Sequence, residues 1–330
     1  KPYWFDGWVG GKPGKNYAVG FGAVTPYYEE KSAEGEVTKR FLDAGENPPD
    51  GVVMTYHIKE TPKPEDEVAL IISTPDGGEV TRFTPLPNKN KDEKEDGNGE
   101  RKVEKGKRYL SVKPGMNRFV WNMRWADGVK VDGEDPIAIR PRGPRVPPGD
   151  YQLTLKVNGH QESTSFKIVR DPRIDASQAD LDAQFGLLRS IQEKLSETNQ
   201  AINTVRSLKG QVKKWKDLLK DHPQVAEIKA AGDQLTAKLS EVEEALTPTG
   251  ATTEWESFNY QARLASRLAS LSPVVGSSDH RPTSQSFEVF EKLSGEIDEV
   301  LQKLAGIVAE DVAAFNRLLA GYQVPSLVSG

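Results

Sequence analysis

The sequence predicts two structural classes in one chain, a β-sheet region followed by an α-helical region, with an extended arm at the N-terminus. Pro and Gly are dense up to Arg170 and become sparser after it. Short apolar runs bounded by turn residues fill residues 48–170, whereas residues 171–330 carry helix formers with apolar residues three and four positions apart. We therefore expect an immunoglobulin- or fibronectin-like β-sandwich followed by an up-and-down antiparallel helical bundle.

Residues 1–47 are rich in both aromatic residues and glycine, which is too much glycine for a helix and too short a segment for its own core. The aromatic residues are Tyr3, Trp4, Phe5, Trp8, Tyr17, Phe21, Tyr27 and Tyr28. So many large rings need a cover. The arm is expected to pack on its own sandwich, to grip another protein, or to stack on sugar rings.

Residues 48–170 show about seven short β-patterns separated by turn signals. The expected strands are Val52–Ile58, Val68–Ile72, Val80–Phe83, Tyr109–Val112, Arg118–Met123, Tyr151–Val157 and Ser165–Val169. Asn158-Gly159 predicts a type I′ hairpin between the last two. The charged stretch 88–107 is expected to be a solvated loop. A calcium loop does not fit it, because Lys94 and Val103 occupy ligand positions.

Residues 171–330 show repeated apolar stripes of helical period, which are typical of a buried core. A helix of about 40 residues starts near Asp180 and carries Leu181, Phe185, Leu188, Leu195, Ile202, Val205, Val212 and Leu219. A second helix follows Pro223, a third spans Phe258 to Leu271, and a fourth begins after Pro282-Thr283 and reaches Leu319. Short connections between them predict antiparallel neighbours.

The composition and motifs give no sign of an active site. There is no Cys, and the four His (His57, His160, His222 and His280) share no metal-ligand spacing. No carboxylate pair, phosphate loop or nucleophile motif stands out, so we predict no catalytic residue, no metal and no cofactor, and a chain that is not an enzyme. A net charge of −5 argues against a nucleic-acid partner, and no apolar run reaches the length of a transmembrane segment.

One basic cluster is distinctive: Arg140, Arg142 and Arg145 lie in a run with Pro141, Pro144, Pro147 and Pro148. Proline stiffens the segment and lowers the entropy lost on binding, so the three arginines could hold an anionic partner. The alternative is a stiff loop whose arginine stems pack on aromatic rings.

Several motifs together resemble a bacterial family. They are residues 47–60 (Asn-Pro-Pro-Asp-Gly-Val leading into Tyr-His-Ile-Lys-Glu), 115–124, 143–151, 171–173 and 315–319. Their order and spacing are similar to the C-terminal region of exported proteins with Asp-box or sortilin-like propellers, which are often labelled glycosyl hydrolases. The resemblance covers roughly residues 45–325 and implies an Ig-like sandwich, a helical segment and export. The propeller has no counterpart here, and none of the motifs is catalytic.

The expected function is therefore a non-catalytic structural or interaction subunit of a larger assembly outside the cytoplasm or attached to a membrane. The periplasmic face of an electron-transfer or photosynthetic complex is one version. The arm aromatics and Arg140, Arg142 and Arg145 are the candidate partner-binding residues. The alternative is a carbohydrate-binding accessory module using Trp4, Trp8 and Trp125. A chain that begins at Lys1 is expected to be either processed or a fragment. The resemblance favours processing on export to the periplasm or cell exterior.

Overall fold

The computed structural model describes residues 16–20, 23–31, 37–41, 48–63, 65–86, 108–133, 135–219, 225–251, 253 and 259–321, with backbone alone for the first three ranges. The chain forms two compact units. The β unit contains Lys1–Trp125 and Gly149–Val169, and the α unit contains Ala126–Pro148 and Arg170–Gly330. Antiparallel sheets and α-helices are both present, so the predicted β + α class is confirmed.

The candidate arm contains a sheet of its own. Strands β1 (Asn16–Gly20), β2 (Ala23–Lys31) and β3 (Val37–Phe41) pair antiparallel in that order. Gly20 pairs with Ala23, so only two residues connect β1 to β2, the loop length that favours a tight hairpin.

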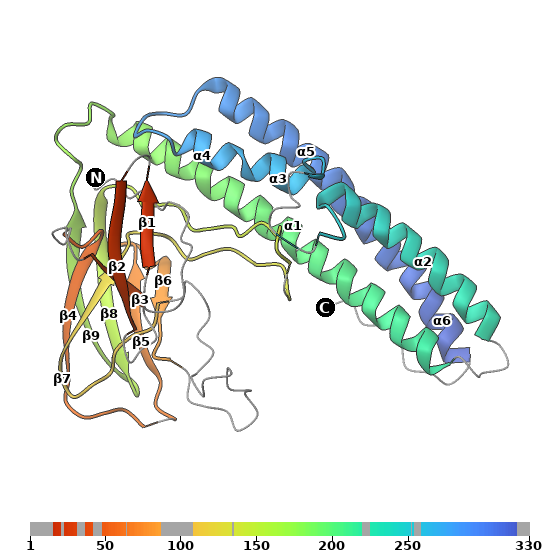
Figure 1. Cartoon of the computed structure of the whole chain (residues 1–330), viewed down its shortest axis with the longest axis horizontal. Coiled ribbons are helices and arrows are strands. Elements are labelled where there is room, and N and C mark those ends of the chain that lie inside the picture. Colours follow the sequence, from red (N-terminus) through yellow and green to blue (C-terminus); the bar gives the residue numbers. More distant parts are fainter. Residues whose placement is uncertain are drawn as a thin grey trace. The chain divides into compact units, whose positions relative to one another are not determined.

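Two further antiparallel sheets make up the rest of the β unit (Figure 1). One pairs β4 (Val52–Ile58) with β7 (Gly115–Trp121). The other has the order β6-β5-β8-β9, with β5 at Val68–Ser73, β6 at Glu79–Phe83, β8 at Gly149–Val157 and β9 at His160–Ile168. The predicted turn is confirmed, because Asn158 and Gly159 both have positive φ, at 48° and 83°.

One predicted strand is wrong. Residues 109–112 form no strand, and Leu110 makes only an isolated bridge with Pro85. Leu110 is nevertheless buried. The apolar residue at this position therefore indicates burial in the core and not a strand. The segment lacks the ladder of backbone hydrogen bonds that a strand needs.

The β4–β7 sheet and the four-stranded sheet contact each other through aromatic side chains. Phe83 of β6 lies 4.5 Å from Phe119 of β7, centroid to centroid, and Trp121 of β7 lies 6.1 Å from Tyr151 of β8. Trp121 is fully buried, and its indole N–H donates to the carbonyl of Arg124 at 3.0 Å. The core of the β unit thus lies between β4–β7 and the four-stranded sheet.

Helix α1 (Gln178–Leu218) confirms the predicted long helix. It begins with a capping box in which the Ser177 side chain accepts from Asp180 N–H and the Asp180 carboxylate accepts from Ser177 N–H. The second predicted helix is α2 (Val225–Leu246).

The third predicted helix is broken in two, α3 (Leu264–Ala269) and α4 (Leu271–Val275). Pro273 has no N–H to donate back to α3, but its ring is tolerated in the first turn of a new helix. Phe258, the predicted start of this helix, lies outside the described residues.

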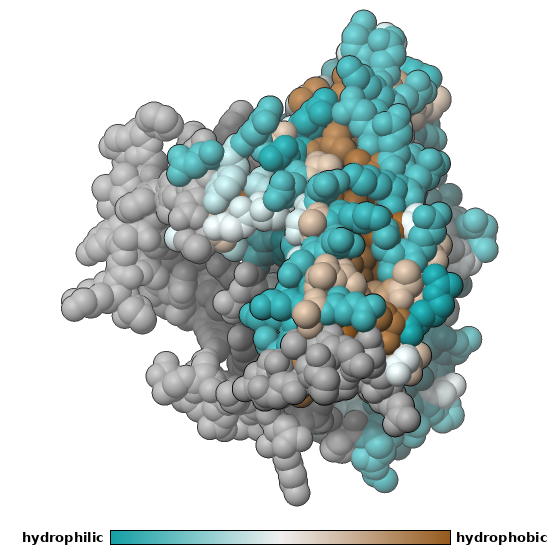
Figure 2. Space-filling view, turned by 90° about the vertical axis from the view of Figure 1, so that its right-hand side faces the viewer, coloured by the Kyte–Doolittle hydropathy of each residue, from teal (hydrophilic) through white to brown (hydrophobic). Residues whose placement is uncertain are grey.

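The fourth predicted helix runs as α5 (Ser284–Ile307), a π-helical turn η2 (Val308–Val312) and α6 (Ala313–Gly321), and Thr283 caps it as expected. Helices α1, α2 and α5 lie side by side, and their apolar stripes form the core. Figure 2 shows apolar residues between rows of hydrophilic ones on the face of the α unit turned to the viewer.

Helix α1 begins at Gln178, and the segment Ala126–Pro148 belongs to the same α unit. It was expected within the β-sandwich because it lies between two strands in sequence. Its polar backbone groups find their partners on α1, as described next, and this places it with the helices.

Candidate interaction surface

Residues 126–148, which we call the strap, are an irregular segment held against α1. The strap has two limbs that run beside each other. Gly128 N–H donates to the carbonyl of Pro141 at 2.7 Å, and Gly143 N–H donates to the Asp127 carboxylate at 2.8 Å. The strap also carries the three arginines singled out from the sequence.

A stripe of polar residues on α1 holds the strap. Its members are Gln192, Ser196, Asn199, Asn203 and Arg206, spaced four, three, four and three residues apart. This spacing places them along one side of the helix, and each of them bonds to a backbone or side-chain atom of the strap. We call this set the polar clamp.

At one end of the clamp, Gln192 joins the two limbs. Its Nε2 donates to the carbonyls of Ala126 at 2.8 Å and Pro141 at 3.3 Å. Arg189 donates to the Gln192 Oε1, which fixes the amide with its nitrogen toward the strap. Ser196 then accepts from the N–H of Val129 at 3.2 Å.

In the middle of the clamp, Asn199 is fully buried and again joins both limbs. Its Nδ2 donates to the carbonyls of Val129 at 2.8 Å and Ile139 at 2.9 Å. One turn further on, Asn203 accepts from the N–H of Asp132 at 2.8 Å and donates to the carbonyl of Lys130 at 2.9 Å. These bonds satisfy strap groups that would otherwise be left without partners on the helix surface.

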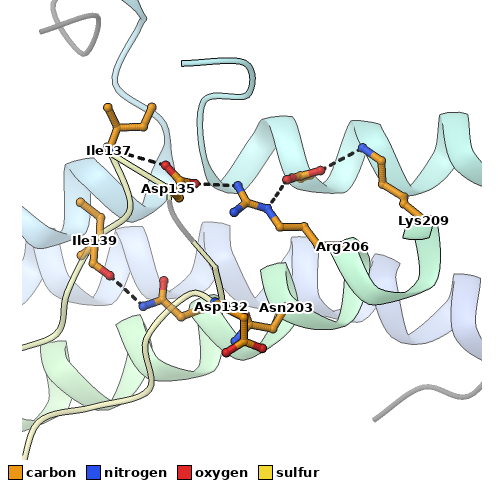
Figure 3. A network of polar contacts seen from close by, with 9 residues as sticks. Asp132, Asp135, Ile137, Ile139, Asn203, Arg206 and Lys209 are labelled. Carbon is orange, nitrogen blue, oxygen red and sulfur yellow. Dashed lines mark hydrogen bonds and ion pairs between the residues drawn. The ribbon is translucent and has the colours of Figure 1, made fainter. Parts of the chain in front are cut away.

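The last clamp residue ties the end of the strap into a charge network (Figure 3). Arg206 Nη2 lies 2.8 Å from Asp135 Oδ2, and its Nε lies 2.6 Å from Glu243 Oε1 on α2. Lys209 approaches the other Glu243 oxygen at 2.9 Å, and Asp135 also accepts from the N–H of Ile137 at 3.1 Å. Two cations thus face two carboxylates, with the Glu243 side chain only 6% exposed.

The electrostatics of this network keep Arg206 charged. Burial acts to lower its pKa, but the hydrogen bonds to Glu243 and then Asp135 outweigh that effect and raise the pKa overall. The network therefore fixes the strap tip to α1 and α2 without leaving a buried charge uncompensated.

The strap also approaches α1 closely at Gly128. A Cβ at this position would lie 2.1 Å from Ser196 Oγ and 3.0 Å from the Pro141 Cβ. Because Ser196 Oγ is already engaged with Val129 N–H and the Gln192 carbonyl, it has little freedom to move aside. Glycine is therefore needed here for contact between strap and helix.

The strap turns its arginines outward. Arg140, Arg142 and Arg145 are exposed, whereas Pro141, Gly143, Pro144 and Val146 between them are buried. The three arginines thus belong to a segment whose apolar and small residues are buried in the folded chain. This is the arrangement of a fixed, basic outer surface.

The other predicted partner-binding residues cannot be placed in the same way. Tyr3, Trp4, Phe5, Trp8 and Phe21 lie outside the described residues. Tyr17 is on β1, and Tyr27 and Tyr28 are on β2, but their side chains also lie outside the described part. Of the rings proposed for sugar binding, Trp125 is half-buried.

The histidines and acidic residues of the described ranges make no metal site. His57, His160 and His280 are exposed, and His222 lies outside the described residues. No group of three or more His, Asp or Glu in the described ranges could hold a metal ion. Among the described helices, none has both the length and the apolar character needed to cross a membrane.

The sequence pattern singled out the arginines but none of the five clamp residues. A signal for the clamp was nevertheless present, because its polar residues repeat at helical spacing and four of the five come immediately after an apolar residue. When the whole chain is compared with known protein families and with curated proteins, no family model and no curated sequence matches it.

Proposed function

We propose that this chain is a non-catalytic interaction subunit of a larger assembly outside the cytoplasm or attached to a membrane, and that the strap is one of its binding surfaces. The observation that carries the proposal is the polar clamp, which fixes an irregular segment on α1 while Arg140, Arg142 and Arg145 stay exposed. The aromatic arm is proposed as a second contact.

The physical support is preorganisation. A free loop of this length loses conformational entropy when a partner orders it, at about 1–2 kcal/mol for each residue fixed. In this chain the ordering has already happened during folding, through hydrogen bonds to the clamp. Arginine then offers planar donors that match carboxylates in pairs.

The two units serve as the scaffold in this proposal. We propose that the β4–β7 and four-stranded sheets form an Ig-like sandwich and that the helices form an antiparallel bundle. Antiparallel pairing, the aromatic contacts between the sheets and the shared apolar core of α1, α2 and α5 support this. The sequence resemblance supports export to the periplasm or cell exterior.

The test is recovery of the native assembly. Membranes of the source organism are solubilised gently, and the companions of a tagged chain are identified by mass spectrometry and native mass. We expect a complex of constant stoichiometry that is lost in the R140E/R142E/R145E variant. The matched control is R118E/R173E/K113E, which reverses three exposed charges elsewhere.

Deleting residues 1–47 tests the arm separately, with circular dichroism to show that the remaining chain is folded. Recovery of the wild-type chain only as a free 36.4 kDa species would reject the proposal. A complex that survives both the arginine reversal and the arm deletion would reject both surfaces.

A further inference from the structure

The spacing of the prolines in the strap determines the spacing of its exposed arginines. Pro141, Pro144 and Pro147 recur at every third position, which is the period of a polyproline II helix. Exposure follows the same period, since Arg142 and Arg145 are exposed while the two residues between them are buried. A polyproline II segment places residues three positions apart on one side, one turn and about 9 Å apart along the backbone.

This arrangement excludes the binding mode by which partner domains commonly recognise proline-rich segments. Aromatic grooves of partner domains bind the proline rings themselves. Here Pro141 and Pro144 are buried in the folded chain, so a partner meets the exposed arginines first. A guanidinium group binds either carboxylate or phosphate oxygens.

The surroundings of the arginines favour separate carboxylates over a continuous polyanion. The exposed Asp127 lies among them, because its carboxylate accepts from the N–H of Gly143, between Arg142 and Arg145. A nucleic-acid strand, which in a duplex carries a charge about every 3.4 Å along the axis, would place phosphates against this carboxylate. A protein segment can place its carboxylates beside the arginines and leave the position opposite Asp127 neutral.

Resting on the proposed function, we propose that the strap binds an acidic segment of a partner protein, with two carboxylates about 9 Å apart facing Arg142 and Arg145. Arg140 is also exposed, but it lies two positions before Arg142 and so falls outside this three-residue period. The clamp holds the row in place, so binding requires little reordering of this chain.

The test uses the full chain and three labelled probes followed by fluorescence anisotropy at low salt. The first is a peptide of about eighteen residues of Glu-Pro-Gly repeats, whose carboxylates recur every third residue and which rebinds through its several repeats. The second is the same peptide with Gln in place of Glu, and the third is an oligothymidine of equal length.

We expect the Glu peptide to bind, the Gln peptide not to bind, and the oligothymidine to bind at least fivefold more weakly than the Glu peptide. R142Q/R145Q is expected to weaken Glu-peptide binding at least fivefold. The control R118Q/R173Q removes two exposed charges outside the strap sequence and is expected to change Glu-peptide binding less than twofold.

Equal or tighter binding of the oligothymidine would overturn the proposal in favour of a polyanion site. Loss of binding in both double variants alike would also overturn it, since net charge alone would then explain the effect. If the native complex depends on the arginines but the Glu peptide does not bind, the acidic-segment inference fails while the proposed function stands. If the native complex ignores the arginines, the strap fails as a binding surface altogether.

Discussion

Two stripes of side chains run along α1 with the same helical period, and they have different structural roles. The apolar stripe includes Ile191, Leu195, Ile202 and Val205. Four of the clamp residues come one position after these, namely Gln192, Ser196, Asn203 and Arg206. One residue is a rotation of about 100° around a helix, so the stripes lie on adjacent sides. The first packs in the helical core and the second holds the strap.

The two stripes differ in how strictly they determine the geometry of the groups that they contact. Burial of apolar area is non-directional, so many side chains of similar volume would fill the core. The clamp depends on hydrogen bonds with fixed distances and angles to particular carbonyl and N–H groups. The apolar stripe therefore supplies most of the stability, while the polar stripe determines which conformation the strap adopts.

The largest effect is expected from the apolar stripe. Leu208 is fully buried, so Leu208→Ala removes packing and leaves a cavity, at about 3 kcal/mol of the free energy of unfolding. Urea unfolding measures this. Leu218→Ala is the matched control, because Leu218 is 71% exposed and its loss should cost less than about 0.5 kcal/mol. Equal effects at the two positions would contradict the assignment of the core.

The charged end of the clamp should come next. Arg206→Met leaves Asp135 and the nearly buried Glu243 short of a cation, at about 2–3 kcal/mol, less than for a fully buried pair because Arg206 is 30% exposed. The R206M/E243Q double variant should recover part of this loss, since it also removes the stranded charge. A double variant that is worse than the sum of its parts would argue against direct coupling.

A smaller effect is expected in the middle of the clamp. Asn199→Ala leaves the carbonyls of Val129 and Ile139 without their donor, at about 1–2 kcal/mol. Hydrogen exchange should quicken at the amides of Gly128 and Gly143 in the strap, and stay unchanged in β5. Gln200→Ala, at an exposed position beside it on α1, is the control. Unchanged strap amides in N199A would mean that the clamp does not order the strap.

The contrast between the stripes also explains what could be predicted from the sequence. Apolar patterns located α1, α2 and the strands β4 to β9, because burial needs only the right residue class at the right spacing. The position of the strap could not be read in this way. In the sequence, an asparagine on a solvated helix face cannot be told apart from one that binds the strap. The partners of Asn199 and Asn203 are backbone atoms some 60 to 70 residues away.

The candidate site shows the same limit. Arg140, Arg142 and Arg145 were identified because a basic, proline-rich run is a local signal. Pro141 between them is buried and contacts Gln192 and Gly128, and nothing near the arginines in sequence indicates these contacts. Likewise, residues 109–112 looked like a strand because a buried leucine gives the same local pattern in a loop.

The smallest effect is expected at the start of α1 and depends on pH. The hydrogen bond from the Ser177 hydroxyl, followed by that from the Ser177 N–H, lowers the pKa of Asp180 below its ordinary value of 3.8, and Arg281 and His280 add to this. A carboxyl group with a lowered folded-state pKa stabilises the fold above its unfolded pKa. That contribution is lost as the pH falls through the folded-state value.

Asp180→Asn should therefore reduce the drop in urea midpoint between pH 7 and pH 3, because the variant has no charge to lose at this cap. Asp182→Asn, in the same helical turn, is the control for the loss of one negative charge near the helix start. The clamp offers no such acid sensitivity through Arg206, whose pKa is raised further above the neutral range. If acid instead loosens the strap amides before the first turn of α1, the charge network and not the cap is the more acid-sensitive part of this helix.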